Sequence, residues 1–158
     1  MAQSGVTRRC VAIIVDEDQL EDYSDFKLEI EEVSNGVIEI EDLQDVQEAE
    51  GVNFDDKLLR FLNLRDAILM FCSDKMTDCI NAKREIQVNF DGTVITLNGG
   101  VLHQNLLKDN LRNKVVLVSM NSNYSVPSIL SEVQRSVKGK GVSKAFANQV
   151  IFAVRGIQ

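Results

Sequence analysis

Three consecutive acidic residues, Asp16, Glu17 and Asp18, directly follow the continuous apolar run at residues 10–15. A run of apolar residues without polar alternation is typical of a strand buried on both faces. Carboxylates clustered at the carboxyl end of such a strand commonly hold a hard cation such as Mg²⁺, which prefers oxygen ligands. The alternative is structural, because acidic residues in the first turn of a helix complement the helix dipole and its free amides.

A second continuous apolar run, at residues 67–71, predicts another buried strand. A polar loop at residues 72–77 follows it, and residues 79–86 then show helical spacing. A helix that packs back onto the strand completes half of a βα unit, with the loop at the carboxyl end of the strand. Open α/β sheets place their binding sites at this edge, so we expect any chemistry to lie there.

The remaining segments continue the alternation of strands and helices. We expect further strands at residues 37–41, 114–120 and 142–146, and helices at residues 19–35, 54–62, 101–111, 126–137 and 148–158. The pair Asp91-Gly92 lies between two alternating segments and predicts an inserted β-hairpin over residues 86–100. Residues 25–41 also fit a hairpin, which leaves an alternative to the first helix. The preferred order predicts a parallel sheet with helices on both faces.

The composition limits the class of protein. A length of 158 residues predicts a single domain, and no apolar run reaches the ~18 residues of a membrane span. Three cysteines, Cys10, Cys72 and Cys79, cannot all pair, which suggests reduced thiols inside a cell. A zinc site is not expected, because no CxxC spacing exists and His103 is the only histidine.

The charge is spread unevenly along the chain. Residues 16–56 contain 17 acidic residues and one base, whereas residues 57–158 contain 14 bases and 7 acidic residues. An acidic first third argues against nucleic acid as the main partner, because phosphate binding needs a basic surface. The acidic residues form either a solvated surface or a face for a basic partner, including the basic part of a second copy.

Several pieces of the sequence resemble the receiver domain of two-component response regulators and hybrid sensor histidine kinases. These pieces are VAIIVDED (11–18), DAILMFCSDKMTDCINAKREI (66–86), VVLVSM (115–120) and Lys144-Ala145-Phe146. The resemblance implies a flavodoxin-like, doubly wound, five-stranded parallel sheet of order 2-1-3-4-5, with the β-hairpin inserted. It also implies a single domain at residues 10–158 after an N-terminal arm at residues 1–9. Insertions near residues 43–53 and 87–113 interrupt it.

The resemblance also implies site residues. Asp16 and Glu17 match the acidic pair that holds Mg²⁺, Ser119 matches the hydroxyl that contacts the phosphate, and Lys144 matches the lysine that binds it. The position of the phosphate-accepting aspartate falls on Phe71, which has no nucleophilic oxygen. We therefore expect no catalytic residue and no cofactor, with Asp16 and Glu17 as a vestigial Mg²⁺ site.

The main hypothesis is a non-phosphorylatable receiver-like domain, not an enzyme, that acts by protein–protein contact in a histidine-to-aspartate phosphorelay. Its partner would be a histidine kinase or phosphotransfer protein, with a homodimer as a further option and neither nucleic acid nor membrane contacted. Its location would be cytoplasmic, including as a soluble fragment of a membrane sensor kinase. One alternative is an active receiver that uses Asp74 as acceptor. The other is an unrelated α/β or α+β adaptor or viral interaction protein.

Overall fold

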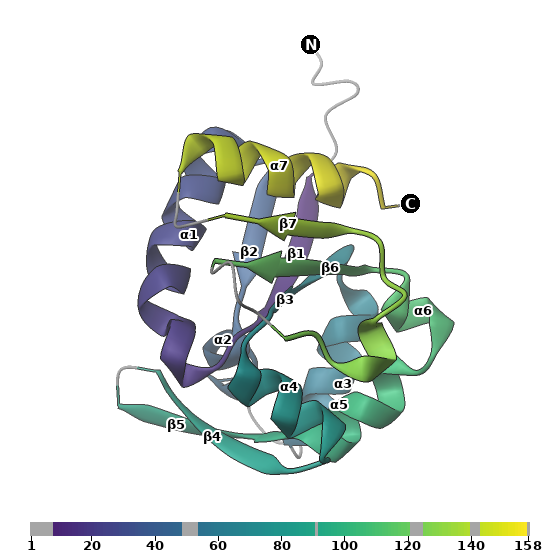
Figure 1. Cartoon of the computed structure of the whole chain (residues 1–158). Coiled ribbons are helices and arrows are strands. Elements are labelled where there is room, and N and C mark those ends of the chain that lie inside the picture. Colours follow the sequence, from purple (N-terminus) through teal and green to yellow (C-terminus); the bar gives the residue numbers. More distant parts are fainter. Residues whose placement is uncertain (1–7, 49–53, 91, 121–124, 140–142, 158) are drawn as a thin grey trace.

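The computed structural model describes residues 8–48, 54–90, 92–120, 125–139 and 143–157 as an α/β fold (Figure 1). Its main sheet is parallel and has five strands in the order β2-β1-β3-β6-β7. These strands are β1 (Arg9–Ile14), β2 (Ile38–Glu41), β3 (Ala67–Phe71), β6 (Val115–Ser119) and β7 (Ser136–Lys138). The predicted parallel sheet is confirmed, and its arrangement is consistent with the flavodoxin-like class.

The three inner strands carry the apolar runs of the sequence. All residues of β3 and β6 are buried, as are the last four of β1. In register, β3 pairs with β1 on one side and with β6 on the other, so that Phe71 lies opposite Val118. Strands buried on both faces need apolar side chains at every position, which explains why these runs lack alternation.

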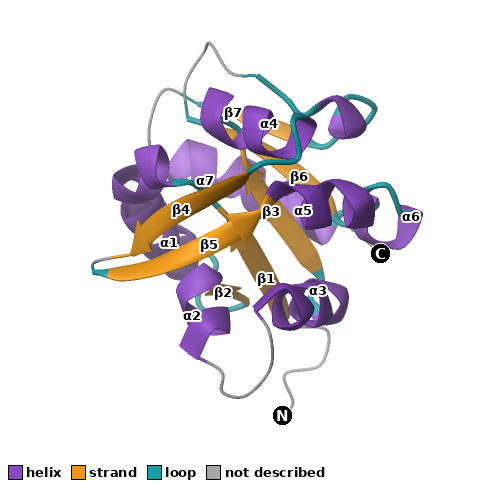
Figure 2. Ribbon diagram, turned by 90° about the horizontal axis from the view of Figure 1, so that it is seen from below, coloured by secondary structure: helices purple, strands orange, loops and turns teal. Residues whose placement is uncertain are grey.

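The helices contact one another in two groups. The first group is α1 (Leu20–Val33) with α7 (Lys144–Arg155), and Figure 2 shows both on one side of the sheet. The second group is linked by successive contacts and comprises α2 (Leu43–Glu48), α3 (Phe54–Leu64), α4 (Asp74–Asn81), α5 (Gly99–Leu106) and α6 (Asp109–Arg112). Two 3₁₀ turns, η1 (Glu17–Gln19) and η2 (Ser128–Leu130), complete the elements. No described helix is long and apolar enough to cross a membrane.

The predicted hairpin is present as β4 (Glu85–Phe90) and β5 (Thr93–Asn98), which pair antiparallel. One face is apolar and buried, where Val88 lies opposite Ile95 and Ile86 lies opposite Leu97. The hairpin reaches η1, which follows β1, and α2, which follows β2. It therefore packs across the carboxyl ends of these strands, as Figure 2 shows from below.

The first part of the chain follows the preferred prediction. Helix α1 occupies Leu20–Val33, so residues 25–41 are a helix followed by strand β2 and not a hairpin. After β3 the prediction was less accurate. The helix begins earlier than expected, at Asp74, because Ser73 caps it by accepting a hydrogen bond from the Met76 amide at 3.0 Å.

The last part of the chain corrects the prediction. The helix expected at residues 126–137 is wrong, because this segment holds only η2 and the start of strand β7. The fifth strand expected at residues 142–146 is also wrong. Residues 140–142 lie outside the described part, and Lys144 begins α7, which Ser143 caps by accepting a hydrogen bond from the Phe146 amide at 3.1 Å. The true fifth strand, β7, lies earlier in the chain.

We predict that Gly99→Ala destabilises the fold and Gly100→Ala does not. A Cβ at Gly99 would lie 1.9 Å from the Cys79 carbonyl oxygen and 2.6 Å from that of Arg84, and both atoms are backbone. At Gly100 the nearest atom is the Asn98 Oδ1, at 3.3 Å. Overpacking of this kind typically lowers the free energy of unfolding by about 1–3 kcal/mol. Urea denaturation should give that loss for Gly99→Ala and a change within about 1 kcal/mol for Gly100→Ala. Equal losses would contradict the tight approach.

Candidate functional site

Asp16 lies at the carboxyl end of β1, where the sequence predicts a cation site. Its side chain is fully buried and accepts a hydrogen bond from the Ser73 hydroxyl. Because Ser73 also caps α4, this bond ties the end of β1 to the first turn of that helix. A carboxylate near a helix N-terminus interacts favourably with the helix dipole. Asp16 therefore has a structural role, because its hydrogen bond joins the central sheet to α4.

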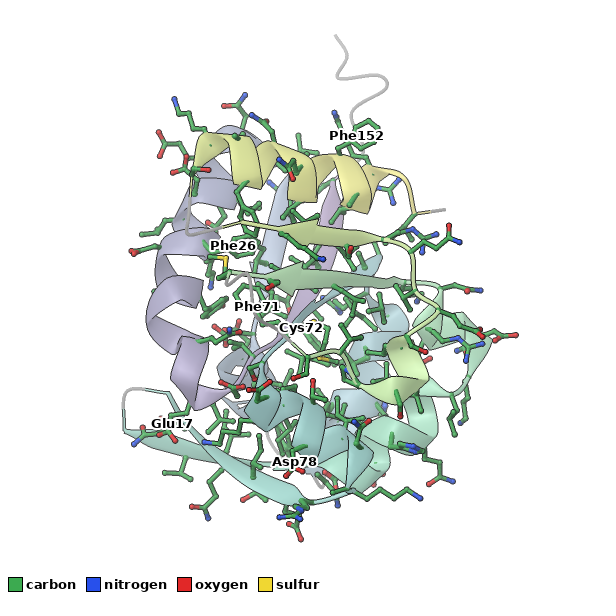
Figure 3. The ribbon with its side chains drawn as sticks, viewed as in Figure 1. Glu17, Phe26, Phe71, Cys72, Asp78 and Phe152 are labelled. Atoms are coloured by element: carbon green, nitrogen blue, oxygen red, sulfur yellow. The ribbon has the colours of Figure 1, made fainter. Side chains whose placement is uncertain are left out.

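Glu17 has a different environment from Asp16. Its side chain is 45% exposed and lies 3.7 Å from the Lys75 ammonium group. Figure 3 shows it at the lower left, toward the hairpin. Within the described residues, no group of three or more histidine, cysteine, aspartate or glutamate side chains could hold a metal ion. One buried, hydrogen-bonded carboxylate and one exposed, paired carboxylate are a poor ligand set for Mg²⁺, which needs converging oxygens in octahedral geometry.

Phe71 ends β3 at the position where the receiver resemblance expects an aspartate. Its ring is fully buried and packs edge-to-face against Phe26, with centroids 5.1 Å apart, and against Tyr23, at 6.2 Å (Figure 3). The Tyr23 hydroxyl donates a 2.6 Å hydrogen bond to the buried Asp42. Burial, followed by the contact with Asp42, raises the pKa of Tyr23 far above its ordinary value. Phe71 is therefore part of an aromatic cluster that attaches α1 to the sheet.

The other predicted residues lie in different environments. Ser119 is buried at the end of β6, and its carbonyl accepts a 2.9 Å hydrogen bond from the Gly139 amide. Lys144 is exposed as the first residue of α7. Asp74 is exposed in the first turn of α4 and accepts a hydrogen bond from the Ser125 hydroxyl. Asp74 thus links α4 to the segment at Ser125, and Asp16 links the end of β1 to the cap of α4 at Ser73.

The most exposed large apolar side chain of the described residues lies elsewhere, on α7. Phe152 is 80% exposed, and Figure 3 shows it at the top of the molecule, remote from Phe71. It lines a groove of about 530 Å³ between α7 and strand β7. Other residues that line this groove are Arg135, Val137, Asn148, Gln149, Ala153 and Gly156. Because β7 is the last strand of the sheet, the groove runs beside a sheet edge.

A smaller hollow of about 430 Å³ adjoins this groove, since Gln134 and Arg135 line both. It also contains Arg112 and Glu132. Groove and hollow together form one surface, which we call the α7–β7 face. An exposed aromatic ring beside arginine side chains is the residue combination that protein interfaces favour. We therefore take the α7–β7 face as the candidate binding surface.

Sequence reasoning did not find this surface, although a signal was present. Residues 150–154 are five consecutive apolar residues. A helix that packs on one face needs an apolar stripe at spacings of three and four, not a continuous run. In α7 that stripe is formed by Phe146, Val150 and Val154, which are buried. Phe152 lies outside this stripe, and an aromatic residue outside the buried stripe of a helix indicates an exposed apolar site.

Comparison with known proteins gives a likeness among solved structures. No family model matches the chain, and no curated protein matches it. Among solved structures, the chain is similar to a prokaryotic SEFIR domain. The TM-score is 0.57 at 16% sequence identity, over 94% of this chain and 98% of the other. At this identity the likeness shows the fold alone.

This finding corrects the receiver resemblance, and with it the hypothesis of a non-phosphorylatable domain in two-component signalling. The physical reason is that buried parallel strands look alike in unrelated α/β proteins. The resemblance placed Lys144 in the turn before the last helix, yet Lys144 begins α7, and the last strand lies at Ser136–Lys138. A histidine kinase or phosphotransfer partner loses its basis, and so does the use of Asp74 as a phosphate acceptor.

We predict that Mg²⁺ at millimolar concentration leaves the melting temperature of the chain unchanged. A ligand that binds only the folded state raises the melting temperature, by mass action. Asp16 is engaged with Ser73 and Glu17 is directed to Lys75, so neither carboxylate is presented for a shared cation. Thermal denaturation with Mg²⁺, and with EDTA as the control, measures the effect. A clear upward shift that EDTA reverses would establish a working cation site.

We also predict that the stability of the fold decreases as the pH rises above 9. Burial raises the pKa of Cys72 to about 12 and, with the charges of Asp78 and Asp16, that of Cys79 to about 11. The unfolded chain loses these protons near pH 9 while the folded chain keeps them, so ionisation favours unfolding. Each thiol should contribute a slope of about 1.4 kcal/mol per pH unit. Urea denaturation measures this slope, which Cys72→Ala should reduce. An unchanged slope in this variant would contradict the assignment.

Proposed function

We propose that this chain is a protein-interaction module of the adaptor type, and that it binds through the α7–β7 face. The single observation that carries the proposal is the 80% exposure of Phe152 beside the groove and the arginine side chains. Water contact with so large an apolar side chain is unfavourable, and burial in an interface removes it. Exposed apolar surface with a polar rim commonly marks a site of protein interaction.

The carboxyl edge of the sheet supports the proposal by contrast. The side chain of Asp16 is buried against Ser73, and Phe71 is part of the aromatic cluster. The hairpin packs against η1 and α2 at the same edge. This edge is the usual place for a ligand in an open α/β sheet, but here apolar packing and structural hydrogen bonds occupy much of it. Binding at the α7–β7 face, beside the edge strand β7, leaves these contacts intact.

The structural likeness supports a partner that is a protein. SEFIR domains are signalling adaptor modules that act by interaction. A shared fold does not carry a function with it, so the likeness adds to the argument from Phe152 and does not replace it. It favours the alternative reading of an adaptor over any reading based on phosphoryl transfer.

The proposal includes no catalytic activity, no cofactor and no nucleic-acid partner. The acidic first third of the chain argues against phosphate binding. An intracellular location is also part of it, supported by the three cysteines, which are free thiols in the structure. The buried Cys72 and Cys79 have raised pKa values, so their thiols stay protonated and unreactive at neutral pH.

We predict that a photoreactive phenylalanine analogue at position 152 forms a covalent adduct with a protein partner in the cells that make this chain. The analogue keeps the aromatic ring at the groove of the α7–β7 face, where the side chain of Phe152 is exposed. Electrophoresis and mass spectrometry of the irradiated cells identify the adduct. We expect one dominant product from the analogue at position 152. With the analogue at position 149, which also lines the groove, Phe152→Ser should abolish the product.

Leu64 supplies a matched control, because it is an apolar residue with 68% exposure at the end of α3. The same analogue at position 64 should give no dominant product, since α3 belongs to the other group of helices. Equal adducts at positions 64 and 152, or none at position 152, would contradict a binding role for the α7–β7 face.

A further inference from the structure

A second exposed apolar side chain, Leu28 on α1, has acidic residues at three neighbouring positions of the helix, and one base, Lys27, lines a hollow together with Glu31. Leu28 is 69% exposed. Asp25, Glu31 and Glu32 lie at positions i−3, i+3 and i+4 from it, and all three are exposed. Residues at these spacings are neighbours on a helix surface. Leu28 therefore lies within a negatively charged surface, which we call the acidic α1 face.

The α7–β7 face has the complementary character. Phe152 lies beside a groove that Arg135 lines. Arg112 and Glu132 lie in the adjoining hollow, where Arg112 is paired with Asp109 of its own chain. The groove can accept the projecting leucine of the acidic α1 face, and Arg135 at its wall carries the charge opposite to the carboxylates around that leucine. Shape and charge therefore match between two surfaces of the same chain.

We propose that the partner of the α7–β7 face is a second copy of this chain, which binds with its acidic α1 face. This inference rests on the proposed function and names its partner. Leu28 of one copy would enter the groove beside Phe152 of the other. Asp25, Glu31 and Glu32 would lie against Arg135. Every copy carries both surfaces, so two contacts close into a symmetric dimer or the contact repeats along a chain of copies.

The uneven charge of the sequence agrees with this arrangement. Residues 16–56, which include α1, contain 17 acidic residues and one base, and residues 57–158 carry 14 bases and 7 acidic residues. Opposite potentials on two surfaces attract over about a Debye length, which is ~10 Å at 0.1 M salt. The attraction between copies should therefore weaken as salt is added.

Sedimentation equilibrium of the full chain tests the proposal. At low salt the average mass should exceed that of the monomer and rise with protein concentration, and about 0.5 M salt should lower it. Phe152→Ser and Leu28→Ser should each weaken association at least tenfold. Both side chains are exposed, so neither change should disturb folding, which circular dichroism verifies. Leu64→Ser is the matched control and should leave association unchanged.

A charge exchange tests the pairing of the two faces. Arg135→Glu alone, and the double variant Glu31→Lys with Glu32→Lys alone, should each associate weakly, because like charges then meet. A mixture of the two variants should associate again, because opposite charges face each other at both contacts. Arg60→Glu, at an exposed position on α3, is the control and should have no effect. Failure of the mixture to associate, or equal weakening by Arg60→Glu or Leu64→Ser, would overturn the proposed contact.

The outcome is distinguishable from failure of the proposed function. A chain that stays monomeric at low salt and high concentration, yet forms an adduct at position 152 with a different protein, overturns self-association alone. An adduct whose mass is that of two chains supports both proposals. The absence of any adduct at position 152 contradicts the binding face itself.

Discussion

Burial of β3 on both faces is the constraint on which the rest of the structure depends. All five of its side chains are fully buried, between β1 on one side and β6 on the other. Each large apolar side chain removed from water stabilises the fold by about 1.5–3 kcal/mol, whereas an unpaired buried charge is strongly destabilising. The last position, Phe71, obeys the same rule, because its ring holds α1 through Phe26 and Tyr23. A polar catalytic group at this point would weaken the centre of the sheet.

The hairpin extends this constraint to the carboxyl edge. Its buried residues, among them Val88 and Ile95, need an apolar surface to cover, and the ends of β1 and β2 provide one through η1 and α2. A two-stranded hairpin is only marginally stable alone, so this packing is what holds it. Because the hairpin covers the carboxyl ends of β1 and β2, a partner has access to the surfaces beside the edge strands of the sheet. The edge beside β7 has Phe152 and the groove next to it.

The sequence predicts those parts of the fold whose signal is local. Strands β1, β3 and β6 are continuous apolar runs, and the sequence of the hairpin contains the Asp91-Gly92 signal, of which Asp91 lies outside the described residues, so each could be recognised without its neighbours. Strand β7 could not, because it has three residues, Ser136–Lys138, of which only the middle one is buried. Its conformation depends on pairing with Leu117–Ser119 of β6. The groove beside α7 is formed with residues of β7, so it could not be predicted either. The sequence indicated an exposed apolar site only through Phe152, an aromatic residue outside the buried stripe of α7.

The acidic α1 face poses a physical question that the fold alone does not answer. Asp25, Glu31 and Glu32 are exposed, and Glu31 and Glu32 lie in the last turn of α1, where negative charge interacts unfavourably with the helix dipole. No ion pair between them and a base appears among the salt bridges of the described residues. Hydration screens this interaction but does not explain why an exposed leucine lies beside these carboxylates. A surface that brings arginine side chains and an apolar groove to Leu28 satisfies both features at once. The α7–β7 face of another copy has that combination, which makes the charge asymmetry of the sequence a property of assembly more than of folding.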